Sequence, residues 1–275
     1  MISRRQFVMG ILSGPLLYGA LRVIHLLRTQ DPILRLTIMG ASSCMGYVKA
    51  VLPNWERGHS RVHVAISGGG SYAGLKAIAN GQVEMAIADV IPPPGYIVVP
   101  LRRYSLGRIP IVIVAHSGVG IKRLSWQQAR QVFQGLIQNW RQIGGQDVPI
   151  VVVSRPLSSG AREVVQTRLL AGSEFSPHAI IQLSNGAVAK TVRETPGAIG
   201  YVEAVMPLDN LHIMCLGNHC YQRNDPGQWV LFAEPAIFIR EDAEPLVVDL
   251  AEYLAHDPSR PAFGIYPEPT QGGAS

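Results

Sequence analysis

Short apolar runs alternate with helix-like stretches along most of the chain. A helical pattern covers residues 46–56, between the first two strand-like runs, and others lie between several later runs. The strand-like runs cover residues 33–39, 61–66, 83–88, 109–115, 149–153, 198–202 and 235–239. Strands separated by helices pack as parallel or mixed sheets with helices on both faces, so the pattern predicts an α/β fold.

Turn and capping residues mark the ends of some of these elements. Pro53 predicts that the first helix kinks or ends there, because proline lacks the amide hydrogen that a helix interior uses. Ser125 followed by Gln128 is a capping-box pattern and predicts a helix start, whereas Pro196 predicts that a helix ends before it. The proline-rich segment 91–95 is expected to be a surface crossover.

The excess of positive charge lies at the beginning of the chain. The 275 residues include 24 Lys and Arg against 19 Asp and Glu. Residues 1–30 hold four arginines and no acidic residue, which leaves 20 basic against 19 acidic residues in the rest. A nearly neutral domain does not indicate a nucleic-acid partner.

The first residues look like a targeting signal. Ser3-Arg4-Arg5-Gln6-Phe7 resembles the twin-arginine export motif, and an apolar stretch follows to residue 21. We therefore expect residues 1–30 to be an export signal ahead of a domain over residues 31–275 in a periplasmic or extracytoplasmic location. An amphipathic start or an uncleaved membrane anchor stays open, because residues 18–20 are a poor cleavage site. The stretch is nevertheless shorter than the roughly 20 residues of a spanning helix.

Three cysteines are too few for a disulfide-built scaffold, so stability must come from apolar burial. Cys215 and Cys220 lie in a cluster with His212 and His219, but the spacing fits no common zinc pattern. In an exported protein a disulfide between Cys215 and Cys220 is favoured, and free thiols or a metal site remain as alternatives.

Three segments place small polar residues after a strand and before a helix, where free amide groups and the helix dipole favour anions. They contain Ser42 and Ser43, then Ser71 after three glycines, then Arg155 ahead of Ser159. Arginine adds a planar fork of donors for an oxyanion. Each segment alone is also explained by an ordinary helix cap or a solvated arginine. A nucleotide site is disfavoured, because the glycine-rich segment lacks a Gly-Lys-Ser/Thr ending.

Longer stretches match one family motif by motif. Residues 132–145 and 149–162 carry its Phe, Gly, Ile, Trp and Gly-Gly pattern, then a strand, an arginine and Ser-Gly. Residues 69–89 match its Gly/Ser loop, helix and strand, and residues 196–201 match its Pro-Gly-Ala-Ile-Gly-Tyr. The chain thus resembles, from about residue 34 to 257, the phosphate-binding proteins of bacterial phosphate ABC transporters. The resemblance implies a two-lobed periplasmic-binding-protein-like (type II) fold, with a mixed sheet flanked by helices in each lobe and the ligand cleft between them.

The resemblance also implies a set of phosphate-binding residues that come from both lobes. They are Ser42, Ser43, Ser71, Asp89, Arg155, Ser159, Gly160 and Ala161. The family usually has threonine where this chain has Ala161, which removes a hydroxyl donor and puts the identity of the oxyanion in doubt. An acidic or small residue is common where this chain has Leu157, so a different orientation of Arg155 is expected.

The function implied is extracytoplasmic binding of inorganic phosphate by a monomer that delivers it to the permease of an ABC transporter in the inner membrane. No cofactor, metal or catalytic residue is expected. Closure should bring together a first lobe of about residues 33–109 and 201–266 and a second lobe of about residues 110–200, since a ligand held by both favours the closed state.

Asp89 is the expected basis of selectivity. Near neutral pH phosphate still carries a proton and sulfate does not, so a buried carboxylate accepts a hydrogen bond from phosphate and repels sulfate. Two unit charges about 4 Å apart interact by about 4 kcal/mol at an effective dielectric near 20, which is about a thousandfold in binding. The competing interpretation of Asp89 is a surface or capping aspartate.

Other functions remain as alternatives. A sulfate- or molybdate-binding protein or a phosphate sensor would share the fold, and the alanine at position 161 leaves these open. A phosphatase is the alternative from another class, but Ser159 has no base partner evident in the sequence and His63 lies in a strand pattern, where histidine is more often structural.

Overall fold

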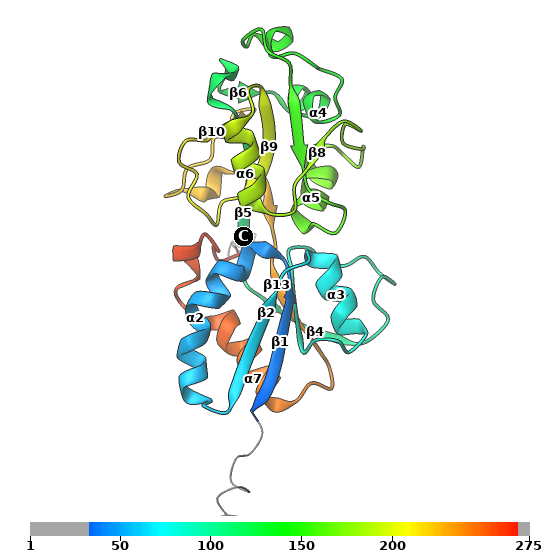
Figure 1. The fold of residues 1–275 in the computed structure, drawn as a ribbon, viewed down its shortest axis with the longest axis vertical. Coiled ribbons are helices and arrows are strands. Elements are labelled where there is room, and N and C mark those ends of the chain that lie inside the picture. The colour runs from blue at the N-terminus through cyan, green and yellow to red at the C-terminus, as the bar shows by residue number, and fades with distance from the viewer. Residues whose placement is uncertain (1–32, 269–275) are drawn as a thin grey trace, which may run out of the picture.

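The computed structural model describes residues 33–268, which form two lobes, each built on its own sheet (Figure 1). The first lobe has a five-stranded sheet in the order β2-β1-β3-β13-β4. Its strands are β1 (Leu34–Gly40), β2 (Val62–Ser67), β3 (Met85–Ala88), β4 (Leu101–Ser105) and β13 (Ala236–Arg240). β1 is parallel to β2 and to β3, and β13 is antiparallel to both of its neighbours.

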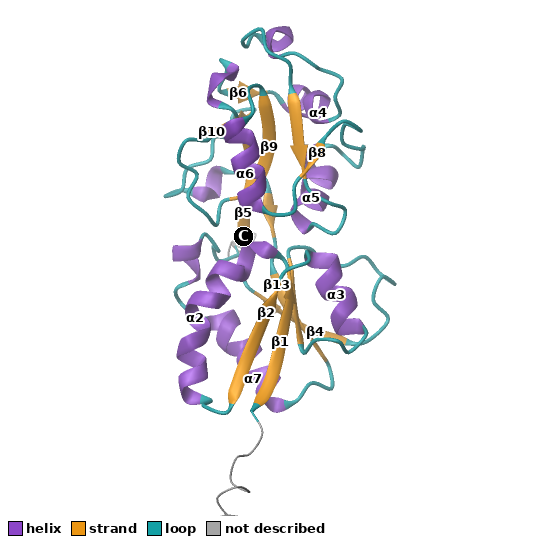
Figure 2. Cartoon of the chain, viewed as in Figure 1, coloured by secondary structure: helices purple, strands orange, loops and turns teal. Residues whose placement is uncertain are grey.

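The helices of the first lobe cover both faces of this sheet (Figure 2). Because side chains alternate along a strand, Met85 and Ile87 of β3 join the core formed with α2 (Met45–Gly58) and α7 (Pro245–His256). Ala86 and Ala88 of the same strand pack with α3 (Ser71–Ala79) on the opposite face. The buried, wholly apolar sequence of β3 therefore follows from its position inside a covered sheet.

The second lobe has a sheet in the order β10-β5-β9-β7-β8, and β12 pairs with the start of β5. Its strands are β5 (Ile109–Ala115), β7 (Val151–Ser154), β8 (Ile180–Ile181), β9 (Ala198–Glu203), β10 (His212–Ile213) and β12 (Phe232–Ala233). A separate two-stranded sheet pairs β6 (Arg123–Leu124) with β11 (Cys215–Leu216).

Helices α4 (Trp126–Phe133), α5 (Gly160–Val164) and α6 (Asn185–Glu194) belong to the second lobe, and a π-helical turn, η4 (Val165–Leu169), continues α5. The capping box predicted for α4 is confirmed, because Ser125 Oγ accepts from the Gln128 amide at 3.1 Å and Gln128 Oε1 accepts from the Ser125 amide at 2.8 Å. The 3-10 turns are η1 (Ser42–Cys44), η2 (Ser117–Val119), η3 (Trp140–Ile143), η5 (Pro226–Gln228) and η6 (Arg260–Phe263).

Two adjacent chain crossings connect the lobes. The chain leaves the first lobe at residues 106–108 and returns at residues 234–235, and the Leu106 amide donates to the Pro235 carbonyl at 2.9 Å. The predicted return after about residue 201 is wrong. Residues 201–233 stay with the second lobe, because β10 and β12 both pair with β5.

Every strand-like run named above forms a strand. Of the two outcomes predicted for α2 at Pro53, a kink or an end, the end is wrong. This helix continues through Pro53 to Gly58 and does not end there. Strand β4 was not predicted, because its sequence Leu-Arg-Arg-Tyr-Ser lacks apolar alternation. The proposed export signal lies outside the described residues, and none of the helices in residues 33–268 has the length and apolar character needed to cross a membrane.

Candidate functional site

The polar residues predicted in the first lobe meet at one edge of its sheet. Ser43 follows β1, Ser71 begins α3 after β2, and Asp89 follows β3. These three parallel strands are neighbours, so their carboxyl ends share an edge. Ser43 Oγ donates to Asp89 Oδ1 at 2.5 Å, and the Asp89 amide donates to Ser71 Oγ at 3.0 Å. All three residues are buried, whereas Ser42 is half-buried at the start of η1.

Gly160 of the second lobe packs directly against this cluster. It is the first residue of α5, and a Cβ built on it would lie 2.6 Å from Ser71 Oγ and 2.9 Å from Asp89 Cβ. Ser159 caps the helix by accepting from the Arg162 amide at 3.4 Å. Ser159 and Ala161 are both buried. The start of α5 therefore places Gly160, one of the predicted donors of the second lobe, against Ser71 and Asp89.

Arg155 is buried and held by the segment that follows β8. Its Nη1 donates to Asn185 Oδ1 at 3.3 Å and its Nη2 to the Leu183 carbonyl at 3.2 Å. Its backbone amide donates to the Tyr201 hydroxyl at 3.2 Å. Among the described residues, its Nε has no hydrogen-bond partner. Because the side chain at position 157 is a leucine that is 77% exposed, the orientation of Arg155 depends on these other residues.

A second buried carboxylate, Glu203 at the end of β9, completes the cluster and was missed at the sequence level. Its side chain is 1% exposed, and its Oε2 lies 3.9 Å from Arg155 Nη1. Burial raises the pKa of Asp89 well above its ordinary value, and the charge of Glu203 raises it further. A hydrogen bond from Ser43 and the charge of Arg155 act in the opposite direction. Asp89 and Glu203 come from different lobes, so this pair depends on the contact between them.

Further contacts join the lobes beside the cluster. The Tyr72 amide donates to the Ser158 carbonyl at 3.3 Å, and the Tyr72 hydroxyl donates to the Glu163 carboxylate. Gly70 has φ of +91°, and a Cβ on it would lie 2.5 Å from the Ser158 carbonyl oxygen, so both the conformation and the close approach require glycine. A surface hollow shares this seam and is lined by Tyr72, Ala73, Lys76, Pro93, Tyr96, Leu157 and Ser158.

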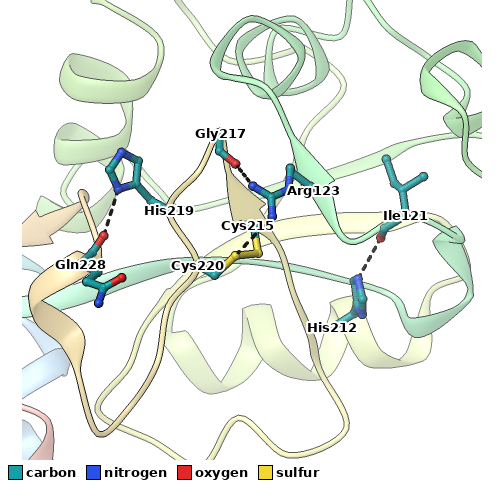
Figure 3. The surroundings of a disulfide bond; sticks show 8 residues. All are labelled: Ile121, Arg123, His212, Cys215, Gly217, His219, Cys220 and Gln228. Atoms are coloured by element: carbon teal, nitrogen blue, oxygen red, sulfur yellow. Dashed lines mark hydrogen bonds between the residues drawn. A yellow bond between two sulfur atoms is a disulfide. The ribbon is translucent and has the colours of Figure 1, made fainter.

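The cysteine and histidine cluster lies apart from these residues, around the small sheet of β6 and β11 in the second lobe. Cys215 and Cys220 form a disulfide (Figure 3). His212 Nε2 is 2.8 Å from the Ile121 carbonyl and His219 Nδ1 is 3.1 Å from the Gln228 carbonyl, so the two rings bind separate backbone groups. Over residues 33–268, no group of three or more His, Cys, Asp or Glu side chains is placed to hold one metal ion.

A family model described as the PBP superfamily domain matches residues 28–234. The chain belongs to the PBP superfamily. The phosphate-binding protein PstS of Bacillus subtilis is 30% identical over 169 residues, which are 61% of this chain and 56% of that protein. The match therefore spans little more than half of this relative. The predicted resemblance to phosphate-binding proteins is confirmed.

Similar solved structures confirm the predicted fold. A putative phosphate ABC transporter substrate-binding protein with bound phosphate, from Clostridium perfringens, has a TM-score of 0.73 at 22% identity and covers 80% of this chain and 92% of that one. An ABC-type phosphate transport receptor from Vibrio cholerae has a TM-score of 0.69 at 20% identity and covers 83% of this chain and 96% of that one. At these identities the likeness concerns the fold.

Proposed function

We propose that this protein binds inorganic phosphate outside the cytoplasm and delivers it to the permease of an ABC transporter. The observation that carries the proposal is the convergence of Ser43, Ser71 and Asp89 from the first lobe with Gly160 from the second, where the charge of Arg155 also acts on Asp89. Hydroxyl groups, helix-start amides and a guanidinium are the donors that replace water around an oxyanion. Within residues 33–268 the Nε of buried Arg155 has no hydrogen-bond partner, so it is a further donor that a ligand would satisfy.

Asp89 provides the proposed discrimination between phosphate and sulfate. Ser43 donates to the Asp89 carboxylate and Ser71 Oγ accepts from the Asp89 amide, which holds Asp89 at the edge of the sheet, where it would accept a hydrogen bond from a protonated oxyanion. A fully deprotonated dianion has no hydrogen to offer and meets a negative charge. We expect sulfate to bind about a thousandfold more weakly than phosphate, from about 4 kcal/mol of repulsion at about 4 Å.

Calorimetric titration of the protein with phosphate and with sulfate tests this function. Phosphate should bind and sulfate should not compete at similar concentration, whereas Asp89→Asn should narrow the difference between the two anions. Tighter binding of sulfate than of phosphate by the unaltered protein would overturn the proposal.

A binding protein for another oxyanion is the second candidate, and Ala161 is the observation that favours it. Ala161 is 1% exposed and has a methyl group where the phosphate-binding proteins that the chain resembles usually have the hydroxyl donor of a threonine. Competition by sulfate, molybdate or arsenate against phosphate distinguishes these ligands. If phosphate binds but no transport defect follows deletion of the gene, a phosphate sensor is the better interpretation.

We infer that the protein is not an enzyme, because Ser159 accepts from a helix amide as an ordinary cap and its relatives are named as binding proteins. An assay with a chromogenic phosphate ester tests this. Turnover that disappears in Ser159→Ala would reveal a phosphatase. The location outside the cytoplasm rests on the arginine motif of residues 3–7 and is tested by fractionation of cells that express Arg4→Lys, Arg5→Lys protein.

A further inference from the structure

Glu203 is a buried acidic group that the phosphate site described above does not explain. It ends β9, all of whose residues are buried, and its own exposure is 1%. Among the described residues its Oε2 has no hydrogen-bond partner. An ionised carboxylate left in this state destabilises the fold unless a neighbouring group compensates it. The groups that compensate the charge of Glu203 must therefore be identified.

The groups that face Glu203 come from both lobes. Arg155 lies behind it with Nη1 at 3.9 Å, too far for a hydrogen bond, because this guanidinium is bonded to Asn185 and to Leu183. Asp89 of the first lobe interacts with Glu203, whose charge and side-chain hydrogen bond both raise the pKa of Asp89, and the charges of Asp89 and Glu203 also raise the pKa of the Cys44 thiol. Tyr201 and Arg162 lie beside Arg155 on the second-lobe side: the Tyr201 hydroxyl contacts Ser154, and Arg162 Nη1 donates to the Arg155 carbonyl.

The charges of this group decide which anion it accepts. With both carboxylates ionised, one positive charge of Arg155 stands against two negative charges, and an incoming anion is repelled. One proton shared between the carboxyl groups makes the set neutral. The charge of Glu203 raises the pKa of Asp89, so a proton is held here more readily than by an isolated aspartate.

We propose that Glu203 is a further specificity-determining residue of the anion site, which forms with Asp89 a proton-sharing pair across the lobes and couples anion binding to the uptake of one proton. This inference rests on the proposed function. The one carboxylate charge that remains on the pair accepts a hydrogen bond from the hydroxyl of a protonated ligand and still repels a fully deprotonated one. The pair thus makes the affinity of the site fall as pH rises.

Calorimetric titration with phosphate from pH 8 to 9.5 measures this coupling, because phosphate is a dianion throughout that range and its own protonation contributes little. The dissociation constant of the unaltered protein should rise about tenfold per pH unit, as expected for one proton taken up. In Glu203→Gln the charges of Asp89 and Arg155 balance without a proton. The dissociation constant of this variant for phosphate should therefore stay nearly constant with pH and be about tenfold lower than that of the unaltered protein at pH 9.

Glu174→Gln is the matched control, because the Glu174 carboxylate also lies near an arginine, Arg162, but is 77% exposed. The pH dependence of phosphate binding by this variant should match that of the unaltered protein. Parallel pH profiles for Glu203→Gln and the unaltered protein would overturn the inference.

A measurement without ligand separates this inference from the function on which it rests. Infrared spectra of the ligand-free protein should show a protonated carboxyl band that persists at neutral pH and disappears both in Glu203→Gln and in Asp89→Asn. If this band behaves so and phosphate fails to bind, the phosphate function is wrong and the proton-sharing pair stands. If phosphate binds and the band is absent, the pair is wrong and the function stands.

Discussion

Gly160 offers a direct test of lobe closure, because a single methyl group there would enter the contact between the lobes. It is the first residue of α5, and its φ is not positive, so alanine fits its backbone. The added Cβ would lie 2.6 Å from Ser71 Oγ and 2.9 Å from Asp89 Cβ, whereas ordinary contacts begin at 3.4 Å. The lobes must therefore separate by about 0.8 Å at this point in Gly160→Ala.

The size of the effect follows from the donors that this separation misplaces. Phosphate would still contact Ser43, Ser71 and Asp89 in the first lobe but lose good geometry to one or two donors of the second. Each donor left unpaired costs about 1–3 kcal/mol, so a total of about 2–3 kcal/mol is expected, or binding about 30- to 150-fold weaker. The variant should still fold, because Gly160 does not need a positive φ and alanine fits its backbone.

Calorimetry measures the affinity, and small-angle scattering with and without phosphate measures the closure. Gly186→Ala is the matched control. Gly186 is the second residue of α6 in the same lobe and is exposed, and no atom lies within 4 Å of a Cβ added there. The affinity of Gly186→Ala for phosphate should therefore be unchanged. The closure geometry is refuted if Gly160→Ala binds phosphate as tightly as the Gly186→Ala control.

Three further predictions concern stability and closure. Because the pKa of Asp89 is raised in the folded protein, its ionisation costs stability as pH rises, by about 1.4 kcal/mol for each tenfold difference in proton affinity between the folded and unfolded states. Asp89→Asn should therefore melt a few degrees higher than the unaltered ligand-free protein at pH 8, and no higher near pH 3, where aspartate is protonated in both states. Loss of the disulfide in Cys215→Ser, Cys220→Ser should lower the free energy of unfolding in urea by about 2 kcal/mol, the value for a loop of about six residues, and an unchanged midpoint would contradict this. Tyr72→Phe removes the hydroxyl bond to Glu163 across the lobes and should weaken phosphate binding about fivefold by calorimetry, because a net hydrogen bond contributes about 1 kcal/mol; equal affinity would show that this bond does not stabilise the closed state.

The sequence predicts the strands whose apolar residues are continuous or alternate, and it fails where a strand shows neither pattern. Strands β3, β5 and β9 are continuous apolar runs, and each was recognised. Strand β4 lies at the edge of its sheet with no buried residue, so no apolar alternation marks it. The return between lobes was misplaced for a related reason, since β10 and β12 are two-residue strands whose place depends on pairing with β5 and not on local sequence.

The candidate site likewise contains residues that the sequence could predict and contacts that it could not. Ser43, Ser71 and Asp89 each follow a recognisable strand, so their meeting could be expected from the parallel order of β2, β1 and β3 alone. Glu203 follows the apolar run of β9 by the same rule, and the rule would have selected it had it been applied to this strand. What no single strand reveals is that Glu203 and Asp89 face each other, because that contact exists only when two sheets that share no strand are brought together. Contacts across the lobes depend on closure, and for that reason Gly160→Ala and Glu203→Gln test different consequences of one arrangement: the first should weaken binding at every pH, and the second should change only how binding depends on pH.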